Sequence, residues 1–293
     1  MKLHWNSIFL IFSLIGLSGC EKELDASFIE TEKQMVVQGF ICPQDTLIQI
    51  TLATNRILGE KIYNNYLPIT NAKVTISDNQ KSVQLSLLKT TKADSLGKWV
   101  RYGVSSKGFM IENGKTYKLN VSSSGFPEIY AECTVPNVVV DEKNINVELG
   151  NELYNGENYK YLNLSWKDFD SDNNYYSWSV VSNVNVEQNG KSQWYGYRYS
   201  TYYQADTYKD GQMLLGQGNI RIGGSNLPYT NKSYVDVYMC NTDKTYFDYN
   251  TSILRQQENR GAAIAEPIAL RGNVQGGLGV FAAYNLTKLR KSL

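Results

Sequence analysis

Carboxylates, tyrosines and cysteines are the residues that could do chemistry in this 293-residue chain, because histidine is almost absent. The single histidine, His4, lies in a segment that we interpret below as a cleaved signal peptide. The mature chain then lacks Ser-His-Asp and Cys-His catalysis, histidine-ligated zinc and histidine acid–base chemistry. Paired carboxylates can hydrolyse glycosides without histidine, but the sequence does not place two of them at the required separation. We therefore expect a protein that is not an enzyme and needs no cofactor.

Three aspartates at alternate positions, Asp168, Asp170 and Asp172, resemble the start of a calcium-binding loop. The EF-hand pattern then requires glycine at position six and glutamate at position twelve. This chain has Asn173 and Ser179 there, so the pattern is incomplete. A loose calcium site is one interpretation of the three aspartates. The interpretation that we favour is a polar turn whose Asp and Asn side chains bond to the local backbone.

Six aromatic residues fall within the ten positions that begin at Trp194. On one strand, Tyr195, Tyr197, Tyr199 and Tyr203 would share a face. Tyrosine has an apolar body and a polar tip, which suits partner interfaces and stacking on sugar rings. The alternative is a tyrosine-rich strand packed on its own neighbours, since tyrosine favours strands. We predict that these residues, with Trp194, form a surface for a partner protein, a glycan or a peptide.

The charge balance argues against nucleic acid as a partner. The chain has 29 basic and 28 acidic residues, and removal of Lys2 with the signal peptide leaves 28 of each. Only Lys191, Arg198 and Lys209 lie near the aromatic run, whereas single-stranded nucleic acid needs a basic groove around such rings. We expect no nucleic acid to bind.

The N-terminus has the pattern of a bacterial lipoprotein signal. Lys2 precedes the apolar run Ile8–Leu17, which has the length of a signal-peptide core and is too short for a membrane span. The sequence LSGC, which ends at Cys20, resembles a lipobox. We predict that residues 1–19 are cleaved and that Cys20 is acylated, a firm anchor because each buried CH₂ contributes about 0.8 kcal/mol. The alternative is an ordinary secretory signal with an incidental cysteine.

A tether over residues 20–32 follows the predicted cleavage site. Its acidic cluster, Glu21–Asp25, resembles the tag that sends Bacteroidetes lipoproteins to the outer face of the outer membrane. We therefore predict a lipid-anchored protein of the outer membrane that faces the cell exterior. The alternative is a plain solvated tether.

Lipidation of Cys20 would leave three cysteines, Cys42, Cys133 and Cys240. An odd number cannot all pair. Cys42 and Cys133 fall in the same predicted domain and could form a disulfide outside the cytoplasm, but buried free thiols are at least as good an explanation. Three cysteines without histidine make a poor metal site.

Alternation of apolar and polar residues with a period of two predicts a mainly β protein. Each such segment is typical of an antiparallel strand with one buried and one solvated face. Five stand out before residue 135: 35–41, 48–52, 72–77, 83–87 and 117–122. Residues 33–135 therefore hold about seven strands, the number in an immunoglobulin-like β-sandwich.

A second β-rich domain is predicted over residues 136–293, with the boundary near Pro136. It contains one exception to the β pattern. Over Thr242–Gln257, Tyr246, Tyr249 and Ile253 recur at helical spacing, which predicts one amphipathic helix. The expected strands of this domain are Ile145–Leu149, Tyr161–Trp166, Tyr175–Val186 and Tyr234–Met239.

Three motifs behind the lipobox resemble the Bacteroidetes outer-membrane lipoprotein family catalogued as domain of unknown function 4249. They are MVVQGFI at 35–41, NAKVTISD at 71–78, and Glu266-Pro267 followed by NVQGGLGVF at 273–281. The resemblance covers nearly the whole mature chain. The family's genes tend to lie near TonB-dependent outer-membrane receptors, so it implies an accessory role in import with such a receptor as partner. It supplies no catalytic residues.

The terminal motif places three glycines in four residues, Gly276, Gly277 and Gly279. Glycine permits positive φ or very close backbone approach. We predict a bulged final strand that closes the second domain. The alternative is a ligand cradle, although the following helix and Lys-Ser/Thr pair of a phosphate loop are missing.

Together these patterns predict a surface-exposed outer-membrane lipoprotein that serves, without catalysis, as an accessory to a TonB-dependent nutrient uptake system. It would capture the ligand or dock on the receptor. Two alternatives remain. One is a stand-alone carbohydrate-binding or carbohydrate-cleaving lipoprotein, and the other is a structural envelope protein.

Overall fold

A computed structural model of the chain describes residues 33–55, 68–88, 99–170, 173–208, 210–216, 220–222, 230–259 and 268–293. The predicted signal peptide, the predicted tether with Cys20, and Asp172 lie outside these residues. Among the described helices, none is both long and apolar enough to cross a membrane.

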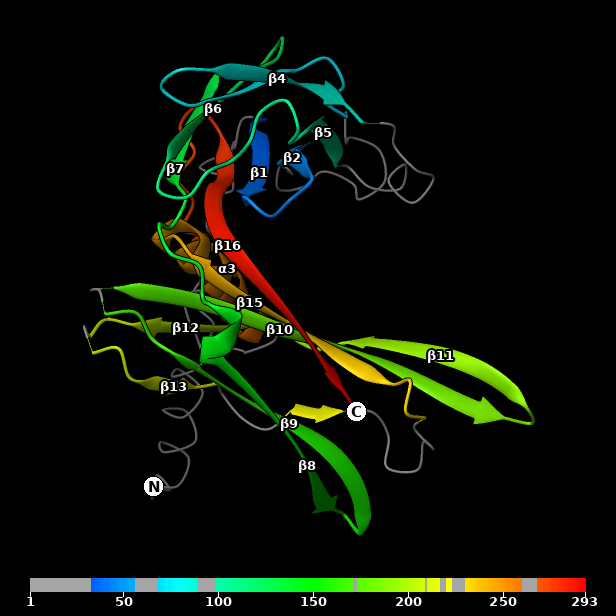
Figure 1. The fold of residues 1–293 in the computed structure, drawn as a ribbon. Helices are drawn as coiled ribbons and strands as arrows, with labels where there is room; N and C mark the ends of the chain where they lie inside the picture. Colours follow the sequence, from blue (N-terminus) through cyan, green and yellow to red (C-terminus); the bar gives the residue numbers. More distant parts are fainter. Residues whose placement is uncertain are drawn as a thin grey trace, which may run out of the picture.

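The protein is mainly β, as the alternation predicts (Figure 1). The first strands are β1 (Met35–Ile41), β2 (Leu47–Thr54), β3 (Lys73–Ser77), β4 (Ser82–Leu87), β5 (Val100–Ser105), β6 (Thr116–Ser122) and β7 (Ile129–Thr134). After the 3₁₀ helix η3 (Glu142–Asn144) come β8 (Ile145–Tyr154), β9 (Glu157–Lys167), β10 (Asn174–Gln188), β11 (Lys191–Arg198), β12 (Tyr202–Asp206), β13 (Met213–Leu215), β14 (Ile220–Ile222) and β15 (Tyr234–Thr242). The helix α3 (Lys244–Glu258) and the last strand, β16 (Leu278–Ser292), complete the described chain.

Two sheets contain these strands. A twelve-stranded sheet has the order β11-β10-β15-β16-β1-β2-β5-β4-β3-β6-β7, and β12 also pairs with β10. A four-stranded sheet is built around β9, with β8 on one side and both β13 and β14 on the other. The protein is therefore a sandwich-like, β-rich fold in which one long sheet runs through both parts of the chain.

Two large apolar clusters fill the interior, and a small third one, with Tyr249, Val280 and Ala282, lies between α3 and β16. The first joins the inward faces of β1–β7, where side chains such as Val37, Leu52 and Leu119 are almost completely buried. The second joins β9, β10 and β15, with Trp166 and Trp178 fully enclosed. Burial of each such side chain stabilises the fold by roughly 1.5–3 kcal/mol.

The amphipathic helix forms where the helical spacing predicts it. Asp243 is its N-cap, because its carboxylate accepts a 2.6 Å hydrogen bond from the Tyr246 amide. The other oxygen of Asp243 accepts a 2.9 Å bond from the Ala283 amide of β16. Burial raises the pKa of this carboxyl to about 6. The capping residue therefore also fixes the helix to the sheet that it covers.

The last strand belongs to both parts of the fold. Leu278–Ala283 pairs in parallel with β1, and Tyr284–Ser292 pairs antiparallel with β15. Phe281 and Ala283 lie in the first cluster, whereas Leu289 packs against the second. The two clusters are therefore not divided at residue 135, and Figure 1 shows β16 running from the upper strands to the lower ones.

The terminal glycines allow this strand to lie close to its neighbours. Gly279 has φ +115°, and a Cβ there would lie 1.8 Å from the Val37 carbonyl oxygen. Gly276 has φ +76°, and a Cβ there would lie 2.0 Å from the Glu128 carbonyl oxygen. The glycines thus serve backbone packing, and the strand that they begin helps to close the first core as well as the second.

The three remaining cysteines, Cys42, Cys133 and Cys240, are buried free thiols. The disulfide between Cys42 and Cys133 that the sequence left open is therefore absent. Burial raises the pKa of Cys42 to about 12, so its thiol is unreactive at neutral pH.

The substitution Gly279→Ala should destabilise the protein by about 3 kcal/mol or more, because it combines positive-φ strain with a backbone clash. Urea unfolding followed by tryptophan fluorescence measures the change. Gly108→Ala is the matched control, since a Cβ there meets nothing within 4 Å. Equal stability of the two variants would contradict the packing role.

Candidate functional site

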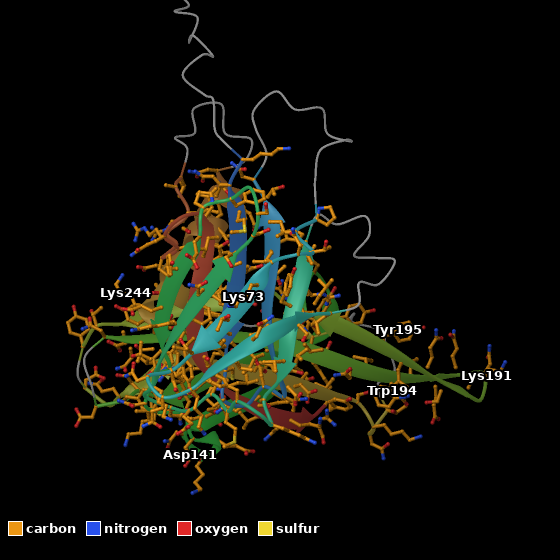
Figure 2. All side chains as sticks on the ribbon, turned by 90° about the horizontal axis from the view of Figure 1, so that it is seen from above. Lys73, Asp141, Lys191, Trp194, Tyr195 and Lys244 are labelled. Atoms are coloured by element: carbon orange, nitrogen blue, oxygen red, sulfur yellow. The ribbon has the colours of Figure 1, made fainter. Side chains whose placement is uncertain are left out.

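The predicted aromatic surface begins on a hairpin formed by β10 and β11. The hairpin projects from the body of the molecule, and Figure 2 shows Lys191, Trp194 and Tyr195 on it. The outer edge of β11 has no partner among the described strands. Trp194 is 52% exposed and Tyr197 45% exposed. These two side chains are therefore available to a partner.

The expectation that four tyrosines share one face of one strand is wrong. The strand β11 ends at Arg198, and β12 begins only at Tyr202. Tyr199 turns inward and packs against the second core. Tyr203, on β12, contacts the α3 residues Tyr246 and Phe247, with ring centroids about 6.5 and 6.4 Å away. Only Tyr195 and Tyr197 remain together on β11.

Trp194 points to the opposite face of the hairpin from Tyr195 and Tyr197, because side chains alternate along a strand. Its ring lies 6.0 Å from the ring of Tyr234 on β15. On this face the sheet continues into β16, and its side chains form what we call the aromatic band. The band consists of Trp194, Tyr234, Asp236, Tyr238, Lys288 and Arg290.

Cations lie over the rings of this band. The Arg290 guanidinium is 3.8 Å from the centroid of Tyr234, and the Lys288 ammonium is 5.2 Å from that of Tyr238. Both cations also bind the buried Asp236. Arg290 donates two hydrogen bonds, of 2.8 and 3.0 Å, and Lys288 lies 3.2 Å away. The Arg290 bonds hold the pKa of Asp236 below its usual value.

The arrangement provides a solvated surface of ring faces and half-exposed cations, suited to stacking and to polar contacts. The sequence analysis did not predict that the β15 and β16 residues of the aromatic band belong to a site. Their only signal is the alternation of Tyr234, Asp236 and Tyr238, with Lys288 and Arg290 two residues apart. Which strands lie beside each other is not visible in that alternation.

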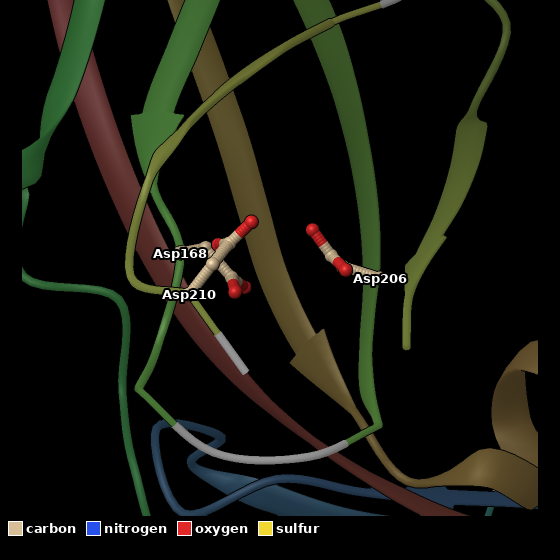
Figure 3. A group of neighbouring side chains, drawn as sticks. All are labelled: Asp168, Asp206 and Asp210. Carbon is tan, nitrogen blue, oxygen red and sulfur yellow. The ribbon is translucent and has the colours of Figure 1, made fainter. Parts of the chain in front are cut away.

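The three aspartates that lie together in the structure are not the three that the calcium-loop interpretation grouped. Asp168 directly follows β9, and its carboxylate lies beside those of Asp206 and Asp210, all within 4.8 Å of one another (Figure 3). Asp170 is exposed and outside this group, and Asp172 lies outside the described residues. Burial raises the pKa of Asp168. The sequence thus indicated one member, Asp168, and missed the other two.

Over the described residues, these features define a mainly β protein with one amphipathic helix and a solvated aromatic surface at the end of its long sheet. A family model described as "Domain of unknown function (DUF4249)" matches residues 21–290. The chain therefore belongs to this family. The search of the curated proteins found no match.

Among solved structures, the chain is similar to the crystal structure of a DUF4785 family protein from Legionella pneumophila subsp. pneumophila. The two are 9% identical, with a TM-score of 0.22. The match covers 71% of this chain and 52% of the other, so the chain spans about half the length of that structure.

Asp236→Asn should destabilise the protein by about 1–2 kcal/mol at pH 7, because it removes the charge that two half-exposed cations bind. A carboxyl whose pKa is lowered by folding contributes stability above its unfolded pKa of about 3.9 and loses it as the pH falls through the native pKa. The difference from wild type should therefore shrink below about pH 4 in urea unfolding.

The control for this change is Glu187→Gln, which removes a surface ion pair with Lys232 at 3.9 Å, both side chains about 60% exposed. Such pairs contribute little, so its effect should stay below about 0.5 kcal/mol. A variant at Asp236 that matches this control at pH 7 would contradict the role of the buried carboxylate.

Proposed function

We propose that this protein is a surface-exposed outer-membrane lipoprotein, anchored through Cys20, that acts without catalysis as an accessory to a TonB-dependent nutrient uptake system. The observation that carries the proposal is the projecting β10–β11 hairpin. Nearly every side chain of β11 is exposed, on both faces of the strand, and Trp194 and Tyr197 are among them. Large aromatic side chains in such positions are enriched in interaction sites.

The edge of β11 supports docking on a protein partner. An edge strand presents unpaired backbone N–H and C=O groups, which another strand can pair with. The exposed side chains Trp194 and Tyr197 would then contribute on the two faces of the extended sheet. A TonB-dependent receptor is the partner that we propose, on the strength of the family's resemblance and the lipobox.

The predicted tether supports a position close to the membrane. Residues 20–32 can extend at most about 45 Å at roughly 3.5 Å per residue. The first strand, β1, begins three residues later at Met35. An acylated Cys20 would therefore keep the body of the protein within reach of a receptor in the same membrane.

A pull-down tests this role. Affinity-tagged protein would be extracted from outer membranes in mild detergent, and the proteins that copurify would be identified by mass spectrometry. We expect a TonB-dependent receptor in stoichiometric amount. Recovery of the lipoprotein alone, from a preparation in which other outer-membrane complexes survive, would contradict the accessory role.

The double substitution Trp194→Ser and Tyr197→Ser should reduce the recovered receptor at least about tenfold, because exposed aromatic anchors carry much of the energy of an interface. Its melting temperature should stay close to that of wild type. Tyr130→Ser is the matched control, since Tyr130 is 48% exposed on β7. Tyr199→Ser should instead lower stability by about 2 kcal/mol, as its partly buried ring packs against the second core.

Normal receptor recovery with the double variant would show that the hairpin is not the contact. The same proteins would also be titrated with glycans, because the exposed Trp194 ring of the aromatic band suits stacking on sugar rings. Independent micromolar glycan binding, lost in the double variant, would favour the rival hypothesis of a stand-alone carbohydrate-binding lipoprotein.

A further inference from the structure

Three carboxylates meet where the chain passes from one sheet to the other. Asp206 is the last residue of β12, in the long sheet. Asp210 lies in the connection to β13, which pairs with β9 in the small sheet. Asp168 directly follows β9, and its amide donates a 2.7 Å bond to the Gln212 carbonyl of the same connection. Figure 3 shows Asp206 facing the other two side chains.

The protein orients each carboxylate through one of its two oxygens. The Oδ1 of Asp168 accepts a 2.5 Å bond from the Tyr176 hydroxyl. The Oδ1 atoms of Asp206 and Asp210 accept bonds of 2.8 and 3.0 Å from the backbone amides of Tyr208 and Gln212. The backbone amide of Phe169 also stabilises the Asp168 carboxylate. The second oxygens of Asp206 and Asp210 make no hydrogen bond or ion pair within the described part of the chain.

The unpaired oxygen of Asp168 indicates that a ligand is missing from this structure. The residue is only 3% exposed, and its Oδ2 is buried with no hydrogen-bond partner. A buried carboxylate oxygen left unpaired is costly, so native proteins almost always satisfy it. A second buried oxygen in the same state is Oε1 of Gln204, which lies on the same face of β12 as Asp206.

Within the described part of the chain, nothing compensates the charges of the group. Three carboxylates lie within 4.8 Å of one another, and no described Lys or Arg forms an ion pair with any of them. A cation between the three would remove both the repulsion and the unpaired oxygen.

We propose that Asp168, Asp206 and Asp210 bind a Ca²⁺ ion that links the two sheets. Calcium takes six to eight oxygen ligands at about 2.3–2.6 Å, in flexible geometry, so two ligands on opposite sides of the ion lie about 4.8 Å apart. The three carboxylates fit within that span as they stand. Magnesium requires bonds of about 2.0–2.1 Å in a near-octahedral shell, and sheds water reluctantly, so it should bind less well.

Isothermal titration calorimetry of the full protein, after removal of metal with a chelator, tests the site with CaCl₂ alone. We expect one site with a Kd of about 10⁻⁴–10⁻³ M, the range of extracellular calcium modules, and at least about tenfold weaker binding of MgCl₂. Asp210→Asn should weaken calcium binding at least tenfold. Asp210 is exposed, and asparagine can keep its bond to the Gln212 amide, so the variant should fold.

Asp170→Asn is the matched control, since Asp170 is a nearby exposed aspartate outside the group. It should retain calcium affinity within about twofold. A melting temperature that rises with calcium in wild type and in Asp170→Asn, but not in Asp210→Asn, would support the same conclusion by mass action.

Three results would overturn the proposal. The first is no calcium binding by wild type up to about 10 mM, well above the weakest extracellular modules. The second is wild-type affinity in Asp210→Asn, or equal losses in both variants, which would place the ion elsewhere. The third is equal affinity for magnesium, which would indicate a nonselective acidic surface.

Discussion

The parallel pairing of β1 with the last strand is the contact on which the rest of the structure depends. It joins Val36–Ile41 to Leu278–Ala283, at opposite ends of the chain. The same strand then pairs with β15 over Tyr284–Ser292. Neither core is complete without it, because it gives Phe281 to the first cluster and contacts the second through Leu289. The family's glycine motif has a physical reason here, since any side chain at Gly279 would meet the backbone of β1.

This continuity also relates the proposed interaction surface to the strand that follows the predicted tether. Lys288 and Arg290 of the aromatic band lie on β16, five and seven residues beyond the segment that pairs with β1. The first strand, in turn, begins three residues after the predicted tether. The band and β1, the strand to which the predicted tether leads, are therefore connected through one hydrogen-bonded strand pair. The orientation of the band relative to β1 is set by that pairing.

Sequence patterns predicted what is local and failed where distant segments meet. The period of two located most strands, and helical spacing placed α3 within two residues of its bounds at Lys244–Glu258. The tyrosine run was wrongly read as one strand because the same alternation continues through the turn after Arg198. The aspartate group unites three segments, and only Asp168 belongs to a short motif. The remaining partners depend on the register of β13 against β9, which alternation alone does not encode.

The proposed calcium site and the aromatic surface share one element, the fifteen-residue strand β10. Its first half pairs with β12, which ends at Asp206, and its second half pairs with β11. The first half is enclosed, because Tyr176 binds Asp168 and Trp178 stacks on Tyr202 at 4.3 Å. The second half extends into the hairpin that carries Trp194. The direction in which the hairpin projects therefore depends on how firmly the first half is held. An ion at the aspartates would hold it by joining β12 to the end of β9.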